Sequence, residues 1–149
     1  MRNGSRGLTL LEVVVALSAL AILAGMGVLA YARMVDDVRL NQAARQIVLD
    51  LVGTRTRALA DNTGRRLVFS VDYDRYQPQV QIGGTYTNDG VPITLPRGID
   101  LIDCTASGAA VTFRPRGNAA TFGTIVLRNR PGHERHVVVD IAGRIRIDQ

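Results

Sequence analysis

Few side chains of this 149-residue chain have the type and spacing that chemistry requires. Glu12 is the most unusual, because it is the only charge between Leu8 and Ala32, in an apolar run that contains "LTLLEVVVALSALAIL". A lone carboxylate inside a bilayer costs several kcal/mol. Glu12 therefore needs either a position at the membrane interface or a cationic partner.

The remaining candidates for catalysis or metal binding are weak. Both histidines lie in "HERH" (133–136), which lacks the H-E-x-x-H spacing that places two histidines on one helix face. Neither a serine nor Cys104 has an obvious catalytic partner, and no glycine loop that would cradle a phosphate occurs. Cys104 is the only cysteine, so it cannot form an internal disulfide. We expect no enzyme activity, no metal site and no cofactor.

The basic residues are all arginine, and they are concentrated near the C-terminus. Between Arg114 and Gln149 there are seven arginines and only three acids, so any attraction for polyanions belongs to this quarter. In "GRIRI" (143–147), strand alternation places Arg144 and Arg146 on one face and the isoleucines on the other. The arginines either form a solvated strand face or contact phosphates, and Arg114 and Arg116 could extend such a patch.

A long helix must position Glu12. The 20 uncharged residues from Val13 to Ala32 suffice to cross a bilayer at about 1.5 Å per residue. Arg2 and Arg6 precede them, which favours a cytoplasmic N-terminus. The run is too long for an ordinary secretory signal. We predict a membrane-embedded half over residues 8–32.

The same helix is predicted to continue as an amphipathic half over residues 33–62. Apolar residues recur there on one helix face, and no proline occurs before Asp61. These residues are Leu40, Ala44, Ile47, Leu51 and Ala58.

From residue 63 to residue 149 the pattern changes to short strand-like runs separated by turns rich in glycine, asparagine and proline. Eight strands are expected, over 66–72, 76–82, 91–95, 99–103, 110–114, 123–129, 135–141 and 144–148. The predicted fold class is α+β, with an antiparallel β domain packed on the amphipathic half of the helix.

The segment "RGLTLLE" resembles the cleavage motif of type IV prepilins and type II secretion pseudopilins. The matching positions are Gly7, Leu8, Thr9, Leu10 and Glu12, although most members carry Phe in place of Leu8. The resemblance implies that a prepilin peptidase removes residues 1–7 by cutting between Gly7 and Leu8, and methylates the new amine. It also implies that Glu12 pairs with the amine of a neighbouring subunit during assembly.

The order "VTFRPRGNAATFGTIVLRN … RHVVVDIAGRIRI" resembles the C-terminal half of the GspH/FimT family of minor pilin-like proteins. That resemblance implies a pilin-like fold and a minor pseudopilin at or near the tip of a type II secretion pseudopilus. Its partners would be other pilin-like subunits and an inner-membrane assembly platform, with the globular domain in the periplasm. A second function stays open, a type IV minor pilin that aids pilus biogenesis or binds DNA for uptake through Gly143, Arg144 and Arg146.

Overall fold

The computed structural model describes residues 9–148, without the side chains of residues 26–30, 32 and 33. The predicted leader, 1–7, and the two residues of the predicted cleavage site, Gly7 and Leu8, lie outside this range. The chain divides between Val35 and Asp36 into two compact units, and helix α1 (Leu10–Ala60, 51 residues) contributes residues to both. The single long helix predicted from the sequence is confirmed.

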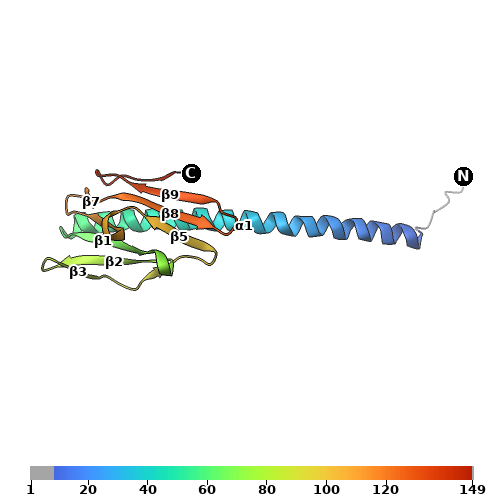
Figure 1. Ribbon diagram of the computed structural model, residues 1–149, viewed down its shortest axis with the longest axis horizontal. Helices are drawn as coiled ribbons and strands as arrows, with labels where there is room; N and C mark the ends of the chain where they lie inside the picture. Colours follow the sequence, from blue (N-terminus) through green and yellow to red (C-terminus); the bar gives the residue numbers. More distant parts are fainter. Residues whose placement is uncertain (1–8, 149) are drawn as a thin grey trace, which may run out of the picture. The chain divides into compact units, whose positions relative to one another are not determined.

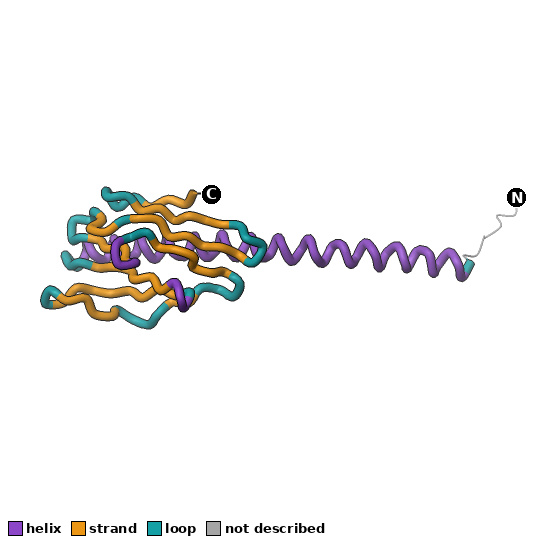
Figure 2. Tube along the Cα trace, viewed as in Figure 1, coloured by secondary structure: helices purple, strands orange, loops and turns teal. Residues whose placement is uncertain are grey.

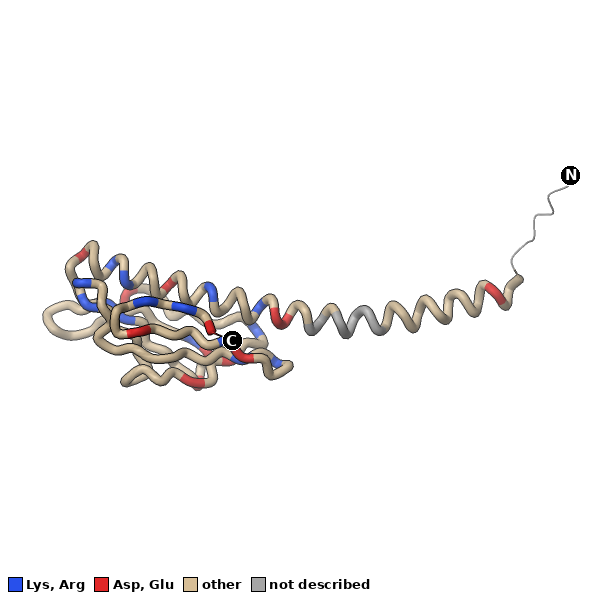
Figure 3. Tube along the Cα trace, turned by 90° about the horizontal axis from the view of Figure 1, so that it is seen from above, with Lys and Arg blue, Asp and Glu red and all other residues tan. Residues whose placement is uncertain are grey.

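In the first unit, α1 presents apolar side chains to solvent on all sides. The exposed fraction is 84% at Leu10, 60% at Val15 and 69% at Leu23. Charged residues are sparse along this part of the helix (Figure 3). Within the described residues, no helix combines the length and the apolarity that crossing a membrane requires. The membrane segment over residues 8–32 stays a prediction.

The second unit places two antiparallel sheets against the second half of α1 (Figures 1 and 2). The first sheet has the order β3-β2-β1-β6-β7, with β4 beside β2. Its strands are β1 (Arg65–Ser70), β2 (Arg75–Ile82), β3 (Thr85–Asn88), β4 (Ile93–Thr94), β6 (Ala110–Phe113) and β7 (Ala119–Thr121).

The second sheet has the order β10-β9-β8-β5. Its strands are β5 (Ile99–Cys104), β8 (Gly123–Asn129), β9 (Glu134–Val139) and β10 (Ile145–Asp148). Two short 3-10 helices, η1 (Val71–Tyr73) and η2 (Ser107–Ala109), connect strands of the domain.

All eight predicted strands exist, but β3 and β7 were not predicted. β3 ("TYTN") lies at a sheet edge and contains no aliphatic residue, so it lacks the apolar alternation that identifies a half-buried strand. β7 ("AAT") has only three residues, too few to show a period. The strand predicted over 91–95 shortens to Ile93–Thr94.

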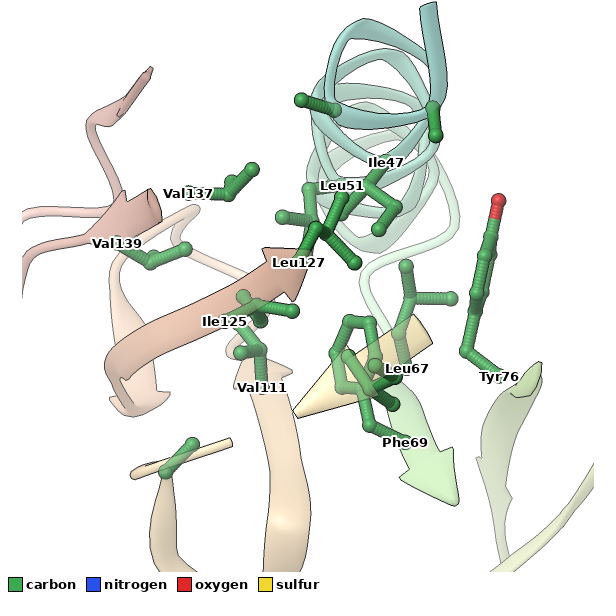
Figure 4. Close-up of a cluster of buried hydrophobic side chains, with 14 of the residues drawn as sticks. Ile47, Leu51, Leu67, Phe69, Tyr76, Val111, Ile125, Leu127, Val137 and Val139 are labelled. Atoms are coloured by element: carbon green, nitrogen blue, oxygen red, sulfur yellow. The ribbon is translucent and has the colours of Figure 1, made fainter. Parts of the chain in front are cut away.

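One hydrophobic core joins the helix to both sheets. Ile47 and Leu51 of α1 lie against Leu127 of β8 and are fully buried (Figure 4). Leu67, Phe69 and Tyr76 of the first sheet belong to the same cluster. All five apolar helix positions singled out by their spacing are at most 1% exposed, so they form one buried face of α1.

Polar contacts fix the helix to each sheet. The buried Tyr76 hydroxyl of β2 donates to the Asp50 carboxylate of α1. At the other sheet, Asn129 Nδ2 donates to Asp37 Oδ1 at 2.8 Å, and His133 Nδ1 lies 2.6 Å from the same oxygen. Tyr76 and Asn129 are buried, and buried polar groups need partners, so the bonds of these two residues specify how the strands dock on the helix.

Candidate functional site

The N-terminal motif begins helix α1 by capping it. The Glu12 N–H donates to Thr9 Oγ1 at 3.3 Å, and the Val13 N–H donates to the Thr9 carbonyl at 3.2 Å. Thr9 is therefore the N-cap residue, and Thr9 with Glu12 has the T-x-x-E spacing of a capping box. The T-x-x-E spacing is visible in the sequence, but the motif was interpreted only as a cleavage site, so the helix cap was not predicted.

Glu12 combines a favourable charge position with apolar surroundings. Its carboxylate lies in the first turn of α1, where the helix dipole favours negative charge. Together with Val13, Ala16, Leu17 and Leu20 it lines a shallow hollow of about 320 Å³. The arrangement presents one acid at the edge of an apolar surface.

Near the C-terminus, the backbone conformation and the close packing at position 143 require a glycine. Its φ is +77°, and a Cβ atom placed on it would lie 2.5 Å from the Gly117 carbonyl oxygen. Arg55 of α1 donates from Nε to that same oxygen at 2.7 Å. The turn at 140–143 and the turn at 114–117 therefore lie against each other, and Gly143 is required for their packing.

The two arginines after Gly143 are exposed but paired. Arg144 Nε lies 2.9 Å from Asp140 Oδ2, and Arg146 Nε lies 3.0 Å from Asp148 Oδ2. The pKa of Asp140 is lowered, chiefly because the Arg144 backbone N–H donates to its carboxylate. Each arginine thus has an acid beside it, which reduces its attraction for phosphate.

Arg114 and Arg116 lie in the neighbouring turn and have no ion-pair partner among residues 9–148. With Asn62, Pro115 and Asn118 they line a surface hollow of about 300 Å³. The structure thus brings Arg114, Arg116 and Gly143 to one end of the domain.

The histidines of "HERH" bind separate acids. His133 contacts Asp37, and His136 Nε2 lies 3.4 Å from Glu134 Oε2. Over the residues that the structure describes, no three histidine, cysteine or acidic side chains form a group that could hold a metal. Cys104 is half-buried, and burial raises the pKa of its thiol.

A capped N-terminal helix packed on antiparallel sheets defines a pilin-like protein. The family described as "Type II transport protein GspH" matches residues 43–143, and the "Prokaryotic N-terminal methylation motif" matches residues 2–28. Because the first match spans more than half of the chain, the protein belongs to the GspH family. A comparison with curated proteins finds no match.

Solved structures of two minor filament subunits share the fold. The minor pseudopilin EpsH from the type 2 secretion system of Vibrio cholerae aligns with a TM-score of 0.61 and 13% identity, over 74% of this chain and 96% of EpsH. The type IV minor pilin FimU of Pseudomonas aeruginosa aligns with a TM-score of 0.59 and 18% identity, over 74% of this chain and 88% of FimU. These likenesses establish the pilin-like α+β fold.

Proposed function

We propose that this protein is a minor pseudopilin at or near the tip of a type II secretion pseudopilus, where it supports protein export across the outer membrane. The observation that carries the proposal is the match of residues 43–143 to the GspH family, joined to a methylation motif at the N-terminus. The role is structural, and the chain's partners are other pilin-like subunits.

In this proposal a prepilin peptidase cuts between Gly7 and Leu8 and methylates the amine of Leu8. Arg2 and Arg6 keep the leader in the cytoplasm, and the uncharged run from Val13 to Ala32 anchors the chain in the inner membrane. The β domain then lies in the periplasm. An inner-membrane assembly platform moves the chain into the filament.

In this proposal, the Glu12 carboxylate pairs with the N-terminal amine of a neighbouring filament subunit. After cleavage the amine of Leu8 is a cation close to the apolar phase, and a neighbouring Glu12 can pair with it when helices lie side by side. Each charge alone is costly in an apolar environment, so pairing also favours one register between subunits.

The test compares Glu12→Ala with Glu134→Ala, which removes the only other glutamate. Because Glu134 lies in β9 of the β domain, its variant should insert and assemble normally. Glu12→Ala should insert in the inner membrane but co-purify severalfold less with the filament subunits. Equal recovery of both variants would exclude charge pairing at Glu12.

A second candidate function is DNA binding by a type IV minor pilin. The hollow lined by Arg114 and Arg116 favours it, because these guanidinium groups have no acid partner in the described part of the chain. Phosphate contacts of this kind are independent of base sequence and weaken as salt rises.

A gel-shift assay with duplex DNA separates the two functions. DNA binding predicts retardation at low salt, and this retardation should weaken in Arg114→Ala/Arg116→Ala and in Arg144→Ala/Arg146→Ala. No retardation, or retardation that neither double variant changes, would remove the DNA hypothesis.

A further inference from the structure

Two surface turns meet at the end of the β domain where α1 finishes, close to β7 (Figure 1). The turn at 114–117 is closed by a hydrogen bond from the Gly117 N–H to the Arg114 carbonyl at 2.8 Å. The turn at 140–143 abuts it through Gly143. The last turn of α1 lies beside both, since a Cβ atom on Gly117 would be 3.1 Å from Leu59 Cδ1. We call these three segments, together with Phe122, the distal end.

Apolar side chains are exposed at the distal end. Ile141 is 65% exposed, and Leu59 and Phe122 are each 48% exposed. The chain around Phe122 runs beside the turn at 140–143, because the Ala119 N–H donates to the Ile141 carbonyl at 3.1 Å. Single exposed apolar residues are ordinary on a protein surface, whereas a group of them gathered at one place marks an interaction site.

Ile141 is unusual for its position as well as for its exposure. The Gly143 N–H donates to the Asp140 carbonyl at 2.9 Å, so Ile141 and Ala142 occupy the two central positions of a four-residue turn. Glycine, proline, asparagine, aspartate and serine dominate such turns. The hydrogen bond that Ile141 accepts uses its backbone carbonyl, so neither the turn nor that bond requires an isoleucine side chain.

Arginines lie in or next to the same two turns. Arg114, Arg116 and Arg144 are exposed, and the first two have no ion-pair partner among the residues that the structure describes. The acids nearby are compensated, because Asp61 and Asp140 are each paired with an arginine. The distal end therefore carries an excess of positive charge beside its apolar side chains.

A polar hollow of about 300 Å³ belongs to the distal end. Its lining combines the guanidinium groups of Arg114 and Arg116 with the amide side chains of Asn62 and Asn118. Guanidinium and amide nitrogens donate hydrogen bonds, and guanidinium groups bind phosphate oxygens especially well. The hollow therefore suits a phosphate group.

The combination of apolar and basic groups decides the class of partner. A polyanion such as DNA is held by arginine–phosphate contacts and has no need of the exposed Ile141. An apolar protein surface would bury Arg114 and Arg116 without counter-charges, which is costly. An anionic bilayer accepts both kinds of group, because apolar side chains enter the boundary between headgroups and acyl chains while bases contact the headgroups.

We propose that the distal end docks on the surface of an anionic phospholipid bilayer. Ile141, Phe122 and Leu59 enter the headgroup boundary. Arg114 and Arg116 contact the lipid phosphates. The inference goes beyond the proposed function, since a lipid contact at this end does not require that the chain enters a filament.

The experiment carries the full chain in nanodiscs of phosphatidylcholine, which hold its apolar N-terminal helix. Vesicles made of equal parts phosphatidylglycerol and phosphatidylcholine are then added, and the protein that floats with them in a density gradient is measured. The wild type should float with these vesicles and should not float with vesicles of pure phosphatidylcholine. Equal recovery with both kinds of vesicle, or recovery with neither, would overturn the proposal.

Ile141→Ser tests the apolar contribution. It should reduce the affinity for anionic vesicles about tenfold, which corresponds to roughly 1.4 kcal/mol. Val91→Ser is the matched control, because Val91 is 79% exposed but lies in the loop before β4, and it should bind as the wild type does. Since both side chains are exposed, neither substitution should lower the melting temperature.

Arg114→Gln/Arg116→Gln tests the charge contribution. It should reduce the affinity about 30-fold, which corresponds to roughly 2 kcal/mol for two arginines at an anionic surface, and added salt should weaken wild-type binding. Arg97→Gln/Arg130→Gln is the control, because it removes the same charge from two other loops whose arginines are also exposed. An equal loss in the two double variants would mean that overall charge, and not the distal end, binds the vesicles.

A fluorescent probe locates the contact. In a Cys104→Ala background, an environment-sensitive dye on Ile141→Cys should shift its emission to shorter wavelength when anionic vesicles are added. The same dye on Thr94→Cys should not, because Thr94 pairs with Arg75 at the start of β2 and is exposed away from the two turns. Equal shifts at the two positions would contradict docking through the distal end.

The variants also separate a lipid surface from DNA. If vesicle binding falls in Arg114→Gln/Arg116→Gln but not in Ile141→Ser, the distal end is a site for polyanions only, and the lipid proposal fails. These assays use the chain alone, so their failure leaves the proposed function standing. That function is tested separately by recovery of filament subunits with Glu12→Ala.

Discussion

Gly143 owes its identity to backbone geometry and close packing. Its φ of +77° is unfavourable for L-residues, which carry a Cβ atom, and the Gly117 carbonyl leaves no room for such an atom. Gly117 itself has a φ of +81°. The glycine of "GRIRI" is therefore explained by two abutting turns, whichever partner Arg144 and Arg146 contact.

We expect Gly143→Ala to lower the free energy of unfolding by roughly 2–4 kcal/mol, because it adds left-handed strain and a steric clash. Gly132→Ala is the control, since Gly132 also has a positive φ (+94°) but open space around it. It should cost only about 1–2 kcal/mol. Urea unfolding of the full chain in detergent measures both, and equal losses would show that the clash with Gly117 is relieved.

Asp37 makes the stability of the domain depend on pH. Its pKa is lowered, chiefly because the His133 side chain hydrogen-bonds to its carboxylate. A carboxyl group whose pKa is lower in the folded state stabilises the fold above its unfolded pKa of about 3.9, and this contribution is lost as pH falls through the folded pKa.

We therefore expect Asp37→Asn to be less stable than the wild type at neutral pH, with the difference shrinking below about pH 4. Asp103→Asn should behave like the wild type, since Asp103 makes no ion pair within the described residues. Thermal unfolding at several pH values measures both variants. If the stability difference between Asp37→Asn and the wild type stays constant with pH, it does not come from the ionised Asp37 carboxylate.

At the scale of elements, β2 docks on α1 through one buried tyrosine. Tyr76 is 1% exposed, and its hydroxyl donates to the Asp50 carboxylate. The centroid of its ring lies 5.6 Å from the centroid of the Phe69 ring. Burial raises the pKa of this hydroxyl, and the Asp50 carboxylate raises it further. Tyr76 therefore stays neutral and keeps its donor.

We expect Tyr76→Phe to lower the free energy of unfolding by about 2 kcal/mol, the usual value for a hydrogen bond to a charged group. Tyr73→Phe provides the comparison, because Tyr73 is 65% exposed and should change stability by less than about 0.5 kcal/mol. Urea unfolding measures the two. Equal stability of both variants would mean that the bond to Asp50 contributes nothing.

Local patterns identified most of the elements. The spacing of Leu40, Ala44 and Ile47 predicted the buried face of α1, because a helix returns to the same face every three to four residues. The strands with apolar alternation were also predicted. β3 and β7 were missed because pairing with a neighbouring strand, rather than an apolar period, defines them.

At the scale of the whole molecule, the proposed assembly begins with removal of residues 1–7. We expect Gly7→Leu to leave the leader attached, because the proposed peptidase requires a small residue before the cut. Ser5→Leu lies in the leader outside the motif and should be processed normally. Intact-mass measurement of the purified chains distinguishes a mature methylated chain beginning at Leu8 from the precursor. Normal cleavage of Gly7→Leu would contradict the peptidase assignment.

As with the fold, part of the candidate site was predicted from the sequence and part became known only from the structure. The motif from Gly7 to Glu12 was identified from sequence because its residues are consecutive. The sequence also located Arg144 and Arg146, but whether their charges are free depends on turn and strand geometry, which places Asp140 and Asp148 beside them.

The sequence by itself determined the long helix, its buried face, the β-rich domain and the family, because each is encoded by local periodicity or contiguous motifs. Only the tertiary structure decided that Gly143 abuts Gly117 and that His133 contacts Asp37. These features depend on packing between residues far apart in the chain, and no local pattern specifies which distant groups the fold brings together.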